Sequence, residues 1–188
     1  MVWVIVAVLV IALVIAGVVI ARQRRSQRLQ EGFGPEYERT LAEKGDRRAA
    51  ESELLERRER REQLEVRELD PESRERYAER WQAAQRTFVD QPSVAVAEAD
   101  RLVSEVMHER GYPVDEDFER RAADISVDHP VVVENYRAAH GISVRAARNE
   151  ADTEDLRQAL VHFRSLFDEL LGADDKSRDT DEAKEMHR

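Results

Sequence analysis

The side chains best suited to chemistry gather in one polar stretch between two expected helices. Asp124, Ser126, Asp128 and His129 lie within six positions of one another, and His140 lies on the next helix. Carboxylates and imidazoles bind divalent metal ions, so one interpretation is a metal-dependent hydrolase centred on these acids and histidines. Because a serine lies beside a histidine and an aspartate, a nucleophilic triad is a second interpretation.

The spacing of these residues favours a structural role instead. Metal ligands must converge on one point, whereas these would come from a loop and from separated helical positions. The sequence contains no HExxH motif, no nucleophile elbow and no glycine-rich phosphate loop. N-capping alone explains the residue types: we expect Asp128 to cap a helix that begins at Pro130, with His129 packed on the loop. We therefore expect no catalytic residue, metal ligand or cofactor.

The elements that must position these side chains begin with an apolar run. Twenty residues, Val2 to Ala21, carry no charge, and Arg22, Arg24, Arg25 and Arg28 come directly after them. A helix rises about 1.5 Å per residue, so this run spans about 30 Å, the thickness of the hydrocarbon core of a bilayer. We expect a transmembrane anchor at residues 1–21, with the four arginines in contact with anionic lipid headgroups.

The same arginines predict the orientation of the anchor. Basic residues stay on the cytoplasmic side, which places the body of the chain in the cytosol and the amino terminus outside a bacterial cytoplasmic membrane. A cleaved secretory signal is the alternative, but it needs a basic n-region and a shorter apolar stretch. An uncleaved anchor with the body outside would require the arginines to cross the membrane.

The composition narrows the classes of function. The chain has 188 residues, of which 37% are charged, and its net charge is −10. An acidic body argues against sequence-independent nucleic-acid binding, which depends on neutralising phosphates. The chain has no cysteine, so disulfides and cysteine-based zinc sites are excluded. The basic residues are almost all arginine, which indicates a GC-rich bacterial genome.

A charged segment separates the anchor from the rest. Residues 22–35 combine the basic juxtamembrane cluster with a break at Gly32, Gly34 and Pro35. Residues 36–69 consist largely of Glu, Arg, Leu and Ala, which predicts a charged helical stalk, punctuated at Gly45. Its apolar seam is too thin for the heptads of a coiled coil, so we expect a solvated stalk, with coiled-coil pairing as the alternative.

The remaining chain predicts a small helical bundle over residues 70–172. Asp70 before Pro71 is a helix start, Asp90 is a second cap before Pro92, and Thr153 or Asp152 caps the last helix. Apolar residues at helical spacing predict the core, and these are Tyr77, Trp81, Ala84, Phe88, Val96, Ala99, Leu102, Val103, Val106, Met107, Phe118, Ala122, Ile125, Val132, Val133, Tyr136, Ala139, Leu156, Leu160, Phe163, Phe167 and Leu170. Residues 173–188 lack an apolar pattern and predict a disordered acidic tail.

Three segments of the bundle resemble a known family. They are EADRLVSEVMHERGYP (98–113), DFERRAADISVDHPVVVENYRAAH (117–140) and TEDLRQALVHFRSLFDELL (153–171). They are similar to a family of single-pass bacterial membrane proteins without an assigned activity, often labelled hypothetical or secreted. The resemblance covers most of residues 33–171 and implies no ligand residues. A secreted location would conflict with the orientation that the arginines predict.

Together these features predict an all-α, membrane-tethered scaffold that is not an enzyme. Its cytosolic bundle would be presented to a protein partner whose identity, like the oligomeric state, the sequence leaves open. The alternatives are the metal-dependent hydrolase and a protein that organises anionic lipids through its basic segment.

Overall fold

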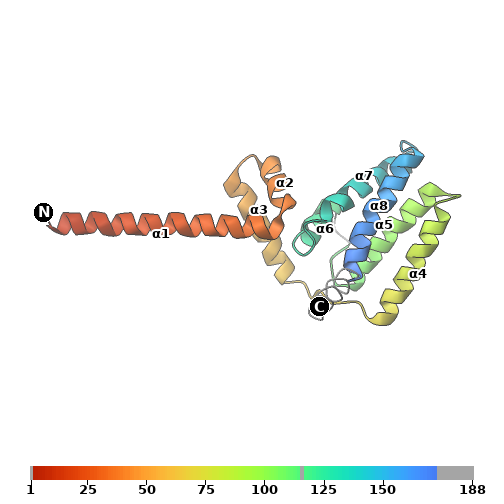
Figure 1. The fold of residues 1–188 in the computed structure, drawn as a ribbon, viewed down its shortest axis with the longest axis horizontal. Helices are drawn as coiled ribbons and strands as arrows, with labels where there is room; N and C mark the ends of the chain where they lie inside the picture. The colour runs from red at the N-terminus through yellow and green to blue at the C-terminus, as the bar shows by residue number, and fades with distance from the viewer. Residues whose placement is uncertain (1, 115–116, 173–188) are drawn as a thin grey trace, which may run out of the picture. The chain divides into compact units, whose positions relative to one another are not determined.

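The computed structural model describes residues 2–114 and 117–172, without the side chains of residues 2, 4–12, 14, 15, 18 and 19. All regular secondary structure in these ranges is helical, which confirms the all-α prediction (Figure 1). The tail predicted at 173–188 lies outside the described residues. The helices are α1 (Val2–Phe33), α2 (Pro35–Lys44), α3 (Arg47–Glu62), α4 (Pro71–Thr87), α5 (Pro92–Glu109), α6 (Phe118–Ile125), α7 (Val133–Ala147) and α8 (Thr153–Leu170).

The chain divides after Glu56 into two compact units. The first, called unit 1, contains α1, α2 and the beginning of α3. The second, called unit 2, begins at Arg57 and contains the end of α3 and α4 to α8. The prediction from sequence placed this boundary at residues 69 and 70, at the end of the stalk.

In unit 1 the break after the basic segment is sharper than predicted. Helix α1 continues through Gly32 and ends at Phe33. Gly34 then adopts a φ of 47°, and Pro35 occupies the first turn of α2, where its missing N–H leaves no hydrogen bond unmade. A second glycine with positive φ, Gly45, ends α2 as predicted.

The predicted stalk is neither one helix nor solvated throughout. Its helical part stops at Glu62, and Ala50 and Leu54 on α3 are completely buried. Ser26 of α1 donates a hydrogen bond to Glu51 of α3 at 2.6 Å, which links α1 to α3 within unit 1. The few apolar positions of this stretch are therefore used for packing within a single chain.

The predicted anchor rests on the sequence alone. Among the described residues, no helix is long and apolar enough to cross a bilayer. The transmembrane anchor at residues 1–21 therefore stays a prediction.

Unit 2 is a bundle in which α5 packs against α4, α7 and α8, and α7 packs against α8 (Figure 1). Trp81 of α4 stacks on Phe167 of α8 with ring centroids 4.5 Å apart. The predicted core is confirmed at every position except four, which are only partly buried: Phe88, Phe118, Val132 and Leu160.

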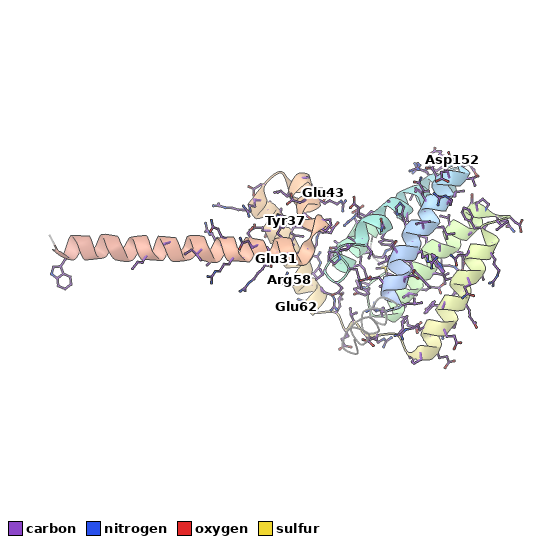
Figure 2. The ribbon with its side chains drawn as sticks, viewed as in Figure 1. Glu31, Tyr37, Glu43, Arg58, Glu62 and Asp152 are labelled. Carbon is purple, nitrogen blue, oxygen red and sulfur yellow. The ribbon has the colours of Figure 1, made fainter. Side chains whose placement is uncertain are left out.

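Local capping explains where the confirmed helices begin. Asp70 accepts a hydrogen bond from the backbone N–H of Ser73 at the start of α4. Asp152, labelled in Figure 2, begins α8 with a reciprocal capping box that includes Asp155, which decides between the two caps that the sequence allowed. Helix α5 differs: its N-cap is Gln91, and no side chain caps it, so the predicted cap at Asp90 is wrong.

The segment between α3 and α4 crosses unit 2 as a strap, residues 63–70. The backbone N–H of Arg67 donates to the carbonyl of Arg110 at 2.9 Å. Gly111 comes next along the chain with a φ of 95°, and a Cβ at this position would lie 2.5 Å from the carbonyl oxygen of Glu65. Glycine is therefore required where the strap passes the end of α5.

Candidate functional site

The polar loop after α6 is held by the last turn of α3. Asp124, at the end of α6, has only 3% of its surface exposed, and its Oδ1 accepts a hydrogen bond from Arg60 Nε at 3.3 Å. A buried carboxylate needs such a partner, because burial of an unpaired charge is costly. The pair fastens α3 to the loop that the sequence identified as the candidate site.

Asp128 has two partners and caps no helix. Its carboxylate accepts hydrogen bonds from Arg61 and from Tyr112 Oη. Helix α7 begins only at Val133, after a turn in which Val133 N–H donates to the carbonyl of His129. The prediction that Asp128 caps a helix beginning at Pro130 is therefore wrong. The carboxylate of Asp128 is bound instead by Arg61 and Tyr112, which are distant in the sequence. Burial, together with the hydrogen bond to Asp128, raises the pKa of Tyr112 well above its usual value.

Ser126 and His129 also have structural partners. Ser126 is completely buried, and its Oγ donates to the carbonyl of Ala123 at 2.6 Å. His129 Nδ1 lies 3.3 Å from Glu169 Oε1 on α8. Burial, helped by the positive charge of Arg110, lowers the pKa of His129 to about 4. The ring is therefore neutral at pH 7, and Nδ1–H donates to Glu169.

His140 belongs to a different group of side chains. Its ring stacks on Phe118 of α6 with centroids 3.6 Å apart and planes inclined by 5°. Its Nδ1 lies 3.7 Å from Asp100 on α5, and that carboxylate also accepts a hydrogen bond from Ser143. The histidine predicted to complete a metal site thus contacts none of the partners of His129.

The geometry therefore does not bring the five predicted residues to one point. Within residues 2–114 and 117–172, no three histidine or carboxylate side chains are grouped so that they could hold a metal ion. Ser126 directs its hydroxyl hydrogen to a backbone carbonyl, so its contacts are not those of a nucleophile activated by His129. The arrangement joins helices and offers no assembled catalytic centre.

A polar network between α4 and α5 was not anticipated. Glu109 accepts hydrogen bonds from Ser73 Oγ at 2.5 Å and from Tyr77 Oη at 2.7 Å, and Arg80 pairs with Glu105 at 2.5 Å. Burial, together with the hydrogen bond to Glu109, raises the pKa of Tyr77 to about 12. The signal in the sequence is the helical spacing within each helix: Tyr77 follows Ser73 by four residues and Arg80 follows Tyr77 by three, while Glu109 follows Glu105 by four, so each set lies on one helix face.

A hollow of about 450 Å³ lies beside this network. Its lining mixes both signs of charge, with Arg67 and Arg101 beside Glu105 and Glu109. Because Arg101 and Arg80 already pair with Glu105, these charges largely satisfy one another. The hollow therefore shows no excess charge that would select a ligand.

A second pocket, of about 410 Å³, lies within unit 1 and differs in charge. Four arginines, Arg22 and Arg25 from α1 and Arg47 and Arg48 from α3, line it together with a single carboxylate, Glu51. Two of the four arginines predicted to contact lipid thus line a pocket, whereas Arg24 and Arg28 do not. Nothing in the sequence indicated that α3 would add two more.

Glu51 organises the inner wall of this pocket. It accepts hydrogen bonds from Ser26 at 2.6 Å, from Arg47 Nε at 3.0 Å and from Tyr37 Oη at 3.1 Å. Tyr37 lies on α2 and is labelled in Figure 2, so one carboxylate joins all three helices of unit 1. Burial opposes ionisation of Glu51, but the hydrogen bonds from Ser26, Arg47 and Tyr37 outweigh it and lower the pKa of Glu51.

Comparison with known proteins identifies no relative from which a function could be transferred. No family model matches the chain, and no curated protein or solved structure is significantly similar to it. The resemblance to single-pass bacterial membrane proteins therefore remains an expectation from sequence, and function must be argued from the side chains of the two units.

Proposed function

We propose that the protein is a membrane-tethered scaffold that holds a helical bundle at the cytosolic face of a bacterial membrane for a protein partner. The observation that carries this proposal is the continuity of α1 from Val2 to Phe33. One unbroken helix joins the apolar run to the four arginines, and its far end packs against α2 and α3 within unit 1. Such a helix suits an anchor that must hold a folded body close to a lipid surface.

The cluster of basic residues after the apolar run supports the orientation. Arg22, Arg24, Arg25 and Arg28 lie within seven positions after it. By the positive-inside rule, the part of the chain that follows these arginines remains in the cytosol.

The surface of unit 2 supports a role in protein binding. Several of its valines are exposed rather than packed, among them Val89 at 82% and Val131 at 73%. Exposed aliphatic side chains are available to a partner, while the acids and histidines with catalytic potential have partners inside the unit. The metal-dependent hydrolase has no comparable observation in its favour, because Asp124, Asp128, His129 and His140 contact different residues.

The location is tested with the full-length chain, tagged at its carboxyl terminus and expressed in a bacterial host. We expect the chain to resist carbonate extraction from membranes, and the tag to survive protease added to intact spheroplasts but not after detergent lysis. The matched variant R22Q/R24Q/R25Q/R28Q should increase the digested fraction. Digestion of the wild-type tag in intact spheroplasts, or release by carbonate, would contradict the proposal.

The partner is tested by fusing a proximity-labelling enzyme to the same terminus. We expect labelled proteins to be cytosolic or on the inner membrane face, and V89S/V131S to reduce labelling of the principal partner. If labelling is confined to periplasmic proteins, or if the valine variant labels the same proteins equally well, the scaffold role is wrong.

A further inference from the structure

We propose that the arginine-lined pocket of unit 1 binds the phosphate of one anionic phospholipid headgroup. The inference rests on the proposed membrane location and adds a defined site with a defined chemistry. The residues of the pocket that matter for binding are Arg22, Arg25 and Ser26 of α1 and Arg47, Arg48 and Glu51 of α3.

The charge of the pocket selects an anion. Four guanidinium groups line it against one carboxylate, and that carboxylate is engaged by Arg47 and Ser26. In the described part of the chain, no ion pair or hydrogen bond engages the side chains of Arg22, Arg25 or Arg48. Three cations are thus available to a ligand, and guanidinium forks match the geometry of phosphate oxygens.

The pocket has a fixed wall, which distinguishes it from a diffuse basic surface. Arg47 donates hydrogen bonds to both Ser26 and Glu51, and Ser26 is buried. This network holds α1 and α3 at a set separation, so Arg25 and Arg48 face the same space from different helices. A preorganised site binds a headgroup more tightly than mobile side chains with equal charge do.

The position along α1 commits the ligand to a lipid rather than a soluble phosphate. Arg22 comes directly after Ala21, the last residue of the apolar run. A side chain one residue beyond the hydrocarbon core lies at the depth of lipid phosphates. The volume, about 410 Å³, accommodates a headgroup.

The chain offers a matched control on the same helix. With about 3.6 residues per turn, Arg22, Arg25 and Ser26 share one side of α1, whereas Arg24 and Arg28 share another. The variant R25Q/R48Q removes two charges from the pocket, and R24Q/R28Q removes two charges outside it. General attraction to an anionic surface predicts equal losses, and a pocket predicts unequal losses.

The test is lipid binding by the full-length chain in uncharged detergent micelles, measured by native mass spectrometry. We expect one dioctanoyl-phosphatidylglycerol to bind about tenfold more tightly than dioctanoyl-phosphatidylcholine. R25Q/R48Q should abolish this preference, and R24Q/R28Q should change it by less than about twofold. Equal losses in both variants, or no preference in the wild type, would overturn the proposal.

Two further measurements keep the outcomes distinct. Inorganic phosphate at the same concentration as the lipid should displace less than about a tenth of the bound lipid, because it lacks the acyl chains. If phosphate competes as well as the lipid itself, the pocket binds a soluble anion and the lipid proposal is overturned. Circular dichroism should show wild-type helicity for R25Q/R48Q. If that variant unfolds, the exposed single substitution R48Q carries the test. Binding in micelles does not depend on the orientation of the chain in a membrane. Carbonate extraction can therefore contradict the membrane tether without contradicting lipid binding in the pocket.

Discussion

Arg60 Nε and Asp124 Oδ1 lie 3.3 Å apart, although 64 positions separate the two residues in the chain. Arg60 belongs to the last turn of α3, and Asp124 lies at the end of α6. The sequence suggested Asp124 as a metal ligand. In the structure it instead forms an ion pair that holds the last turn of α3 against the end of α6 inside unit 2. Arg61 and Asp128, the next pair along, act in the same way.

Removal of either member of the Arg60–Asp124 pair should destabilise unit 2. We expect R60Q or D124N to lower the free energy of unfolding by about 2 kcal/mol, because the other group is left without its charged partner. The double variant should cost less than the sum of the two. Urea unfolding monitored by Trp81 fluorescence in a W3F background measures these values, since the chain has only two tryptophans.

The control for this double-mutant cycle of Arg60 and Asp124 is an exposed ion pair with the same chemistry. Arg164 Nε and Asp168 Oδ2 lie 3.1 Å apart on α8, with 58% and 42% of their side chains exposed. We expect a coupling energy of about 0.3 kcal/mol there. Equal coupling in the two cycles would show that burial of Asp124 does not matter.

Acidification should destabilise unit 2 through His129. Its pKa is about 4 in the folded chain against 6.5 for the exposed residue, so the unfolded state takes up a proton first as the pH falls. The stability conferred by a neutral His129 is complete above pH 6.5 and is lost progressively from pH 6.5 to 4, by about 3 kcal/mol. Comparison of H129Q with the wild type by urea unfolding across this range should show a flatter pH dependence for H129Q.

The carboxylates of unit 2 titrate in both proteins and largely cancel in this comparison. A second reference is H108Q, which removes an exposed histidine from the surface of α5. Should the H129Q and wild-type curves run parallel, His129 would not be buried in its neutral form.

A methyl group at residue 111 should disrupt the strap. Alanine is strained at a φ of 95°, and its Cβ would lie 2.5 Å from the carbonyl oxygen of Glu65. We expect G111A to cost about 2–3 kcal/mol by urea unfolding. The matched change G141A, at a helical glycine of α7 with open space around it, should stabilise by about 0.5–1 kcal/mol. A neutral G111A would contradict the close approach of the strap.

Divalent metals should leave unit 2 unaffected. Asp124 and Asp128 pair with arginines, and His140 stacks on Phe118 instead of approaching His129. We expect Zn²⁺, Mn²⁺ or a chelator to shift the midpoint of thermal unfolding by less than about 1 °C, since a ligand that binds the folded state must raise it. A saturable increase that H129Q abolishes would restore the metal-dependent hydrolase.

Local signals made much of unit 2 predictable. Asp70 before Pro71 caps α4 as expected, and Asp152, one of the two caps that the sequence allowed, begins α8; both act over three residues. The stripe that includes Tyr77 and Trp81 identified the buried face of α4, because one side of a helix must enter the core.

Long-range partners account for the features that the sequence could not predict. Asp128 resembles a cap in the sequence, but the last turn of α3 brings Arg61 to its carboxylate, and the segment after α5 brings Tyr112. Arg47 and Arg48 are ordinary residues of a charged helix until Glu51 and Ser26 bring α3 beside α1. Each case depends on a tertiary contact that no local pattern encodes.

The continuity of α1 has a consequence for how its length can vary. Every residue inserted into a helix rotates the later part of that helix by about 100° and advances it by about 1.5 Å. One extra residue between Arg22 and Ser26 would swing Arg22 away from the side of α1 that meets Glu51. Between those two positions, changes in steps of three or four residues preserve the angular phase, whereas single insertions or deletions destroy it.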